Sequence, residues 1–264
     1  MGHTVTASAI SDPPTFSWQS GPIPLITTPD SQTSTEDQDQ FTHAATEMAL
    51  VHNCVIRALN CIYIQSPHVP ASEHTNFLSF SLATHTGLTL HHDGEESIFF
   101  PELQKLTGET TLMQDNIAGH RAFEAPFAAW GAWLNTCLAG TTRFSAARNT
   151  ALMDAFIPPL TAHLHDEIPT LLALRRFGAA LDLQAMFARE AKTVMGGMRK
   201  RTVLPVFLSN HDRAFEGGMH VFPPLPAPVV WVLGSVCGRV KAEWWKFGAC
   251  GFDGVAREVR FRGE

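Results

Sequence analysis

The chain has 264 residues, 45% of them hydrophobic, so it is long enough to bury a large core. Its formal net charge of -6, with no basic run longer than residues 199–201, excludes the broad basic surface that nucleic acid or an anionic membrane requires. No segment approaches the roughly 18 to 20 apolar residues of a membrane span, and the first residues lack a signal-peptide pattern. We therefore expect an intracellular, cytoplasmic protein without membrane or nucleic-acid partners.

The histidine and cysteine contents differ in what they indicate. Five cysteines, an odd number without a Cys-x-x-Cys spacing, favour neither a disulfide framework nor a zinc ribbon. Thirteen histidines are well above ordinary usage, and a terminal tag does not explain them because only His3 lies near an end. Since histidine is the usual imidazole ligand of transition metals, the composition indicates a metal site.

The first 34 residues are predicted to form an N-terminal arm. They are rich in serine, threonine and proline, and the prolines break any helix, so we expect a flexible start followed by extended chain. Phe16, Trp18 and Ile23 are apolar. The arm is therefore predicted to pack against the rest of the protein.

The first long helix is predicted to begin near residue 35. Ser34-Thr35-Glu36-Asp37 combines a capping hydroxyl with early acidic residues, which is typical of a helix N-terminus. Pro67 and Pro70 end the helical pattern. Its apolar residues recur at steps of three and four, and His52 lies in the middle of this stripe.

A second helix is predicted over residues 72–101, and its register is ambiguous. One acceptable inward stripe carries His91 and Glu95, and another carries His92 and Glu96. In both, a histidine and a glutamate stand four residues apart and project from one helix face, a spacing that suits one metal ion. Periodicity alone leaves the register open.

Two more helices complete the predicted bundle. The third, at residues 113–138, has His120 on its apolar face. The fourth, at 152–174, has the clearest apolar stripe of the chain, which places His163 and Glu167 inward, and its paired prolines predict a kink ahead of His163. Four helices with short connections are typical of an antiparallel four-helix bundle. We therefore predict an all-α fold.

The predicted organisation has three parts, with the arm at residues 1–34, the bundle at 35–178 and a C-terminal extension at 179–264 that packs on the bundle. Within the extension, a fifth helix is expected at about residues 181–195 and a short apolar helix at about 229–240. The remaining material is turn-rich and aromatic, and it contains no glycine-rich phosphate loop.

Inward histidine and glutamate residues on all four helices predict a metal centre. A lone carboxylate or imidazolium in a bundle core costs several kcal/mol unless it is paired or binds a metal. Imidazoles and carboxylates without thiolate suit iron, manganese or zinc. Six donors exceed what one tetrahedral zinc ion uses, so two metals bridged by the carboxylates fit better.

Several other residues share the spacing or the chemistry of this set. His43 and Glu47 lie on a more polar face of the first helix and are interpreted as solvated. Glu124, four residues after His120, is either a further ligand or a surface acid. His211 and Glu216 in the extension remain undecided between a role in supporting the site and a role in the loop scaffold.

These motifs resemble the hemerythrin family of histidine- and glutamate-ligated four-helix bundles. The second helix matches through a His-x3-Glu pair before Phe100-Pro101, and this resemblance selects the register of His91 and Glu95. Further motifs, including Arg57-Ala58-Leu59-Asn60, are similar to the long fungal branch of hemerythrin-like proteins, and the resemblance covers most of residues 16–262. It implies the ligands His52, His91, Glu95, His120, His163 and Glu167.

The resemblance also implies the cofactor and the partner. Members of the family bind non-haem iron, usually as two ions, and dioxygen is the natural partner; manganese or zinc remain as other metals. In the oxygen carriers of the family the third helix gives a second histidine at the position that Glu124 occupies here. The site is therefore expected to differ from that of an oxygen carrier.

Two functions are consistent with this reading. The first is an oxygen-activating diiron enzyme that oxidises a small apolar organic substrate, because the long segments outside the bundle exceed what a carrier needs and their aromatic residues can roof a pocket. The second is a non-enzymatic oxygen or iron sensor, store or carrier. The sequence gives neither catalytic residues nor the oligomeric state.

Overall fold

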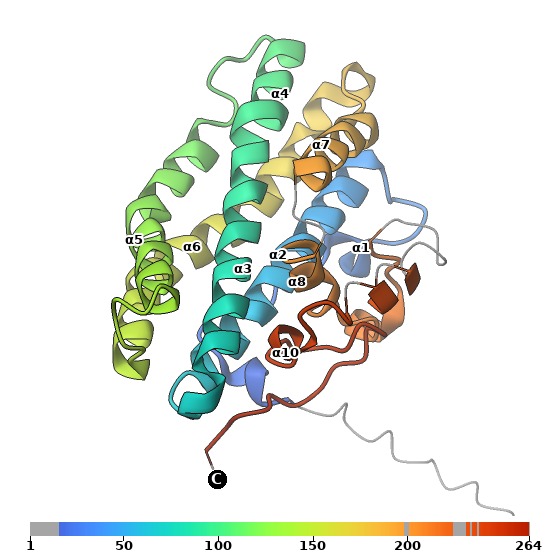
Figure 1. Cartoon of the computed structure of the whole chain (residues 1–264). Helices are drawn as coiled ribbons and strands as arrows, with labels where there is room; N and C mark the ends of the chain where they lie inside the picture. The colour runs from blue at the N-terminus through green and yellow to red at the C-terminus, as the bar shows by residue number, and fades with distance from the viewer. Residues whose placement is uncertain (1–15, 198–200, 224–230, 233, 237, 264) are drawn as a thin grey trace, which may run out of the picture.

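The computed structural model describes residues 16–197, 201–223, 231–232, 234–236 and 238–263, and this part is helical without a β-strand. The predicted all-α class is therefore confirmed. None of the described helices is long and apolar enough to cross a membrane. The helices shown in Figure 1 are α1 (Pro29–Gln32), α2 (Gln40–Gln65), α3 (His74–Gly94), α4 (Phe100–Thr107), α5 (Gln114–Leu138), α6 (Ala146–Ala173), α7 (Leu183–Gly197), α8 (Leu204–Leu208) and α10 (Ala242–Trp245).

The long helices enclose the core. They contact one another in a closed cycle in which α2 packs on α3, α3 on α5, α5 on α6 and α6 on α2. One cluster of buried apolar side chains runs through all of them and continues into α7 and α8. The predicted stripes therefore identified the buried faces of these helices, because an apolar period of 3.6 residues must face a core. The predicted boundaries of the three parts stay predictions.

The first long helix begins later than predicted. Asp39 caps α2, and its Oδ1 accepts hydrogen bonds from the backbone N–H groups of Phe41 (3.0 Å) and Thr42 (2.9 Å). Arg175, just after α6, donates from Nε to Asp39 Oδ2 at 2.6 Å. This hydrogen bond lowers the pKa of the Asp39 carboxyl below its ordinary value. The prediction of a start at residues 34–37 was wrong because a long-range partner favours the later cap.

The second helix continues past its predicted end at Pro101. Helix α3 passes into a π-helical turn at Glu95–Phe99 and then into α4, so helical chain runs from residue 74 to 107. Gly108 ends α4 in the left-handed conformation with φ of 74°. Proline is tolerated here because it occupies the first turn of the helical segment that follows the π-turn.

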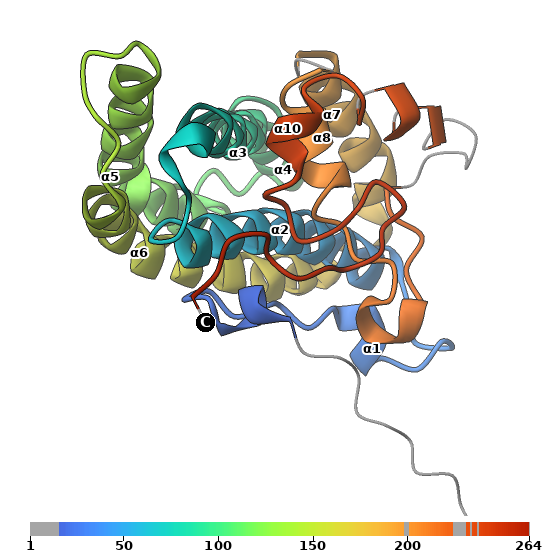
Figure 2. The ribbon, with the colours of Figure 1, turned by 60° about the horizontal axis from the view of Figure 1, so that its bottom comes forward.

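The N-terminal arm packs on α2, as its apolar residues predict. Trp18, Ile23 and Ile26 are buried. Figure 2 shows this segment (blue) running beneath α2 and α6. Two asparagines of α2 hold its backbone: Asn53 exchanges two hydrogen bonds with Ile26 (both 2.8 Å), and Asn60 exchanges two with Ile23 (3.1 and 2.8 Å).

Replacing both asparagines with alanine should detach the arm. The double variant Asn53→Ala/Asn60→Ala removes all four of these hydrogen bonds, each worth a net of about 0.5–1.5 kcal/mol, so we expect a loss of about 2–6 kcal/mol. Urea unfolding measures the loss, and limited proteolysis should cut within residues 16–28. Gln38→Ala removes an exposed amide from the carbonyl of Asp30 and is the control, with a change within about 0.5 kcal/mol. An arm that stays protected in the double variant would contradict this role.

The C-terminal segment covers one side of the long helices. Helix α7, close to the predicted range 181–195, contacts α2, α3 and the π-turn. Gln65 at the end of α2 donates to the carbonyl of Phe247 at 2.9 Å, and Phe247 packs on Phe77 of α3. Of the short helix predicted at 229–240, residues 229, 230, 233 and 237 lie outside the described residues, and residues 231–232 and 234–236 are helical.

Candidate metal centre

The structure brings the six predicted ligands together in the core. They come from four helical segments, and none exposes more than 7% of its surface. Helix α2 contributes one histidine, α3 and its π-turn contribute a histidine and a glutamate, α5 contributes a histidine, and α6 contributes a histidine and a glutamate. In that order the residues are His52, His91, Glu95, His120, His163 and Glu167.

One half of the centre is formed by α2 and α3. The Nε2 atoms of His52 and His91 lie 3.2 Å apart, and His91 Nε2 lies 3.2 Å from Glu95 Oε1. Together the ligand atoms of these three residues lie within 4.8 Å of one another. This is the geometry in which three donors converge on one ion.

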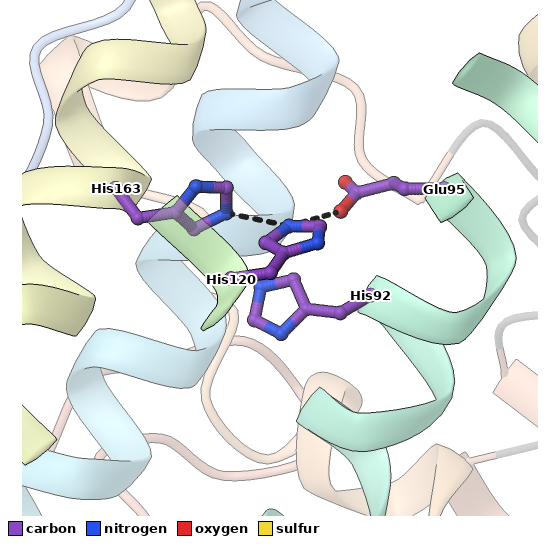
Figure 3. A group of neighbouring side chains, drawn as sticks. All are labelled: His92, Glu95, His120 and His163. Atoms are coloured by element: carbon purple, nitrogen blue, oxygen red, sulfur yellow. Dashed lines mark hydrogen bonds and ion pairs between the residues drawn. The ribbon is translucent and has the colours of Figure 1, made fainter. Parts of the chain in front are cut away.

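The other half is formed by α3, α5 and α6, and it includes a histidine that was not among the predicted ligands. Figure 3 shows His92, Glu95, His120 and His163 facing one another from three helical segments. His120 Nε2 lies 3.0 Å from His163 Nε2 and 3.3 Å from Glu95 Oε2. The ligand atoms of all four residues lie within 4.8 Å of one another.

The two carboxylates connect the halves. Glu95 directs Oε1 towards His91 and Oε2 towards His120, so each half receives one oxygen. Glu167 Oε2 lies 3.4 Å from His52 Nε2 and 3.8 Å from His163 Nε2. Glu95 therefore gives one oxygen to each donor group, whereas Glu167 approaches a histidine of each group through the same oxygen.

The two carboxylates of the centre lack ordinary partners. Glu95 and Glu167 are fully buried, and none of their four oxygens accepts a hydrogen bond of normal geometry from a described residue. His92 Nε2 is also buried without a partner. A carboxylate in this position must be compensated by a cation or neutralised by a proton, and the converging histidine nitrogens make these residues fit a bound metal.

The protonation states agree with this interpretation. Burial raises the pKa of Glu95 and Glu167 well above the ordinary value, so without a cation these groups would hold a proton. Burial, with the charges of neighbouring histidines, lowers the pKa of His91 to about 3 and that of His163 to about 2. Neutral imidazoles with free lone pairs result, which is the form that binds metal.

Two histidines are oriented by hydrogen bonds on the far side of the ring. His52 Nδ1 donates to the carbonyl of Leu164 at 3.0 Å, and His120 Nδ1 donates to Glu96 Oε1 at 2.6 Å. Both partners are acceptors, so the proton resides on Nδ1 and the lone pair of Nε2 faces the centre. Such partners fix the ring and raise the basicity of the ligand.

Removing the partner of His120 should weaken one half of the centre. In Glu96→Ala the Nδ1–H of His120 loses the carboxylate that accepts its hydrogen bond and orients the ring. We expect metal affinity to fall about 10- to 100-fold. Competition with a chelator, followed by metal analysis, measures the change. Glu124→Ala, which removes an exposed acid four residues beyond His120, is the matched control and should bind metal like the unchanged protein. Equal losses in both variants would show a general charge effect.

The π-turn explains how two consecutive aromatic residues of the second helix are both buried. The N–H of Phe100 donates to the carbonyl of Glu95, five residues back. This wider turn shifts the helix face, so Phe99 and Phe100 are both buried. Pro101 favours it, because proline lacks the N–H and clashes with the carbonyl four residues earlier. π-Turns are frequent at functional sites.

The structure buries both histidines of the second helix but only one of its two candidate glutamates. Glu95 is fully buried and Glu96 is exposed, as the resemblance implied. Yet His91 and His92 are both buried, and His92 joins Glu95 at a spacing of three residues. The ambiguous pattern was the signal for this, since it gave both histidines an inward position. Neither His-x3-Glu stripe alone describes the site.

Glu190 of α7 was missed. It exposes 6% of its surface, and burial raises the pKa of its carboxyl to about 7. Its charge also raises the pKa of Glu95 and Glu167, which places it near the centre. A signal was present in the sequence, because Leu183, Met186 and Glu190 form one stripe of which the other two members are buried apolar residues.

The remaining candidates lie outside the centre. Glu124 is exposed, which favours the surface interpretation, and His43 Nε2 pairs with Glu47 at 3.6 Å on a partly exposed face. Neither His211 nor Glu216 belongs to either donor group. Glu216 instead accepts hydrogen bonds from the backbone and hydroxyl of Thr28 in the arm.

Comparison with known proteins gives one informative relative. Over 242 residues the chain is 31% identical to the dimeric xanthone biosynthesis cluster protein R11 of Cryptosporiopsis sp. (strain 8999), and the match covers 91% of each chain. No family model matches the chain, and no solved structure matches it.

Proposed function

The chain belongs to the family of the dimeric xanthone biosynthesis cluster protein R11, and from this premise we propose that it is a hemerythrin-like diiron protein that uses dioxygen to oxidise a small organic molecule. The proposal includes the antiparallel four-helix bundle and an O2-dependent oxidoreductase activity. The name of the relative places that protein in a biosynthesis cluster. A role in synthesis favours an enzyme over a sensor, store or carrier.

One observation carries the proposal. Glu95 is fully buried, accepts no hydrogen bond from a described residue and gives one oxygen to each of two histidine groups. A single ion would leave one of these groups without a charge partner. Two cations bridged by Glu95 and Glu167 would compensate both buried carboxylates and use every converging nitrogen.

The donor set supports iron as the metal. The described centre offers five imidazoles and two carboxylates without a thiolate, a set that suits iron, manganese or zinc. When bound, two ferrous ions would supply two electrons to dioxygen, with the substrate and an added reductant supplying the rest, and zinc lacks such redox chemistry. We therefore propose two iron ions as the cofactor.

The surrounding residues support a protected site. Phe100 stacks on His120 with ring centroids 5.8 Å apart, and Phe123 lies 5.0 Å from His92 and 5.6 Å from His163. These rings exclude water on the α4 and α5 side. Exclusion of water favours oxidation of a substrate over the loss of reactive species to solvent. Because the name of the relative refers to xanthones, we propose a small aromatic substrate.

Metal analysis with absorption spectroscopy tests the cofactor. Protein purified without added metal should contain about two irons per chain, as the bridged geometry requires. An anaerobic, reduced sample should gain an absorption band in the near-ultraviolet or visible range when oxygen is admitted. One zinc ion per chain and an unchanged spectrum would overturn the oxygen chemistry.

Oxygen consumption separates an enzyme from a binder. With a reductant and a panel of phenolic aromatic compounds, an oxidase should consume many equivalents of oxygen per iron pair and release an oxidised product. A carrier or sensor would take up one equivalent and stop. Glu124→Gln is the control that retains activity, because this exposed acid lies outside both donor groups. Oxygen uptake limited to one equivalent with every compound would favour the non-enzymatic alternative.

A further inference from the structure

A second unusual group lies on another face of α2. Arg57 exposes 1% of its surface and stands between Asn53 and Asn60, the two residues that hold the arm. It is five residues from His52, which corresponds to a rotation of roughly 140° about the helix. Arg57 therefore faces the arm and the segment after α8, away from the metal centre.

The charge of Arg57 has no counter-charge in the described part of the chain. Its guanidinium makes one long hydrogen bond, from Nη1 to the carbonyl of Asn210 at 3.3 Å. Its Nε and Nη2 atoms are buried and have no hydrogen-bond partner, a carboxylate included, among the described residues. Arginine does not lose its proton in proteins, so burial cannot be relieved by neutralisation.

The two unpartnered donors form one edge of the guanidinium. The N–H bonds of Nε and Nη2 run parallel on the side of the group away from Nη1. Their spacing matches the two oxygens of a carboxylate, which accepts both hydrogen bonds at once. The free edge is therefore complementary to a planar oxyanion.

The neighbours of Arg57 fit the same ligand. The guanidinium carbon lies 5.7 Å from the ring of Trp18 and 5.0 Å from that of Phe215. The Nε1 of Trp18 and the Nε2 of His211 are also buried without partners. Burial, then the charges of Arg57 and Arg213, lowers the pKa of His211 to about 4, so the neutral ring adds no second positive charge.

We propose that Arg57 anchors a second ligand site, between the arm and residues 210–215, that binds the carboxylate of a small organic acid. The Nε and Nη2 edge of Arg57 holds both oxygens, and the indole N–H of Trp18 and the ring of His211 are the further polar groups available to the ligand. The carboxylate neutralises the buried guanidinium. This inference does not depend on the nature of the metal centre.

Titration of the full-length, metal-loaded protein with formate, acetate and benzoate tests the proposal. Calorimetry should detect one saturable site per chain. Arg57→Met removes the charge and the two parallel N–H donors, and should raise the dissociation constant about tenfold or more. Arg57→Lys keeps the charge without the parallel donors and should weaken binding similarly. Trp18→Phe keeps an aromatic ring without the N–H, and should weaken binding several-fold.

Two controls locate the binding. Arg213→Met makes the same change at an exposed arginine close to His211 and should leave the affinity unchanged. Glu95→Gln disturbs the metal centre and should also leave this affinity unchanged, whereas a carboxylate that binds a metal ion would lose its site in that variant. Tighter binding of benzoate than of formate would assign the carboxylate to an aromatic acid, and the reverse would assign it to a free small anion.

Three results would overturn the proposal. They are the absence of saturable binding by the unchanged protein, equal affinity in Arg57→Lys, and loss of binding in Glu95→Gln. Far-ultraviolet circular dichroism checks the fold of each variant. If Arg57→Met does not fold, Arg57→Lys decides the outcome, because it retains the charge and the aliphatic stem.

Discussion

Glu95→Gln should lower the metal content from about two ions per chain to fewer than one. Glu95 is the residue that both donor groups share, and its two oxygens lie 3.2 Å from His91 and 3.3 Å from His120. Glutamine keeps the size of the side chain but removes the negative charge that a bridging ligand supplies. In contrast, His52→Ala removes a nitrogen from one half and should retain one ion in the other. Elemental analysis after gel filtration measures both.

The same variant should have the opposite effect on the metal-free protein. Burial first, then the charges of Glu190 and Glu96, raises the pKa of Glu95 well above the ordinary value of 4.5. The folded state therefore binds a proton more tightly than the unfolded state, and stability without metal falls as pH rises above about 4.5. Glutamine has no such proton. In a chelator at pH 7, Glu95→Gln should melt at a higher temperature than the unchanged protein.

The loss of metal and the gain in stability of the metal-free protein together make the test specific. A merely structural glutamate would lower stability in both states when replaced. Glu124→Gln, which neutralises an exposed acid on α5, should alter neither metal content nor the pH dependence of melting. Two ions per chain in Glu95→Gln would show that this carboxylate is not a shared ligand.

Trp130→Ala should cause the largest loss of stability outside the centre. The indole is fully buried between Phe127 and Phe156, with ring centroids 5.9 and 5.3 Å away, and its Nε1 donates to Asn149 Oδ1 at 2.9 Å. The cavity costs about 3–5 kcal/mol. The buried Asn149 Oδ1 loses its donor as well, because the contact of Asn149 with Ser66 is made by Nδ2, and the unpaired oxygen adds to the loss. The melting temperature should fall by roughly 10 °C or more.

Two variants separate the parts of this effect. Trp130→Phe keeps an aromatic ring but removes the N–H, and should cost less than the alanine variant. Trp133→Ala truncates a half-buried tryptophan one turn later on α5 and is the matched control, with a smaller loss. Urea unfolding of metal-free samples avoids any contribution from the centre. Equal losses at positions 130 and 133 would contradict the assignment of Trp130 to the core between α5 and α6.

The helical class and most of the donor set could be predicted because both are local properties of the chain. Apolar residues at a period of 3.6 specify a buried helix face regardless of what covers it. A histidine or carboxylate on such a face must be hydrogen-bonded, paired with a charge or bound to a metal. When such residues occur on four helices, one shared metal centre accounts for all of them. His163 and Glu167 on the stripe of α6 are the clearest case, since both are buried where the pattern places them.

Other features depended on contacts between distant segments, which periodicity does not encode. The start of α2 at Asp39 depends on Arg175, and the entry of His92 beside His91 depends on where α5 and α6 place His120 and His163. Glu190 approaches the centre because α7 folds back over α2 and α3. Arg57 is buried because the arm and residues 210–215 close over it. A local pattern fixes which face of a helix is inward, whereas the packing of distant segments determines which polar groups meet there.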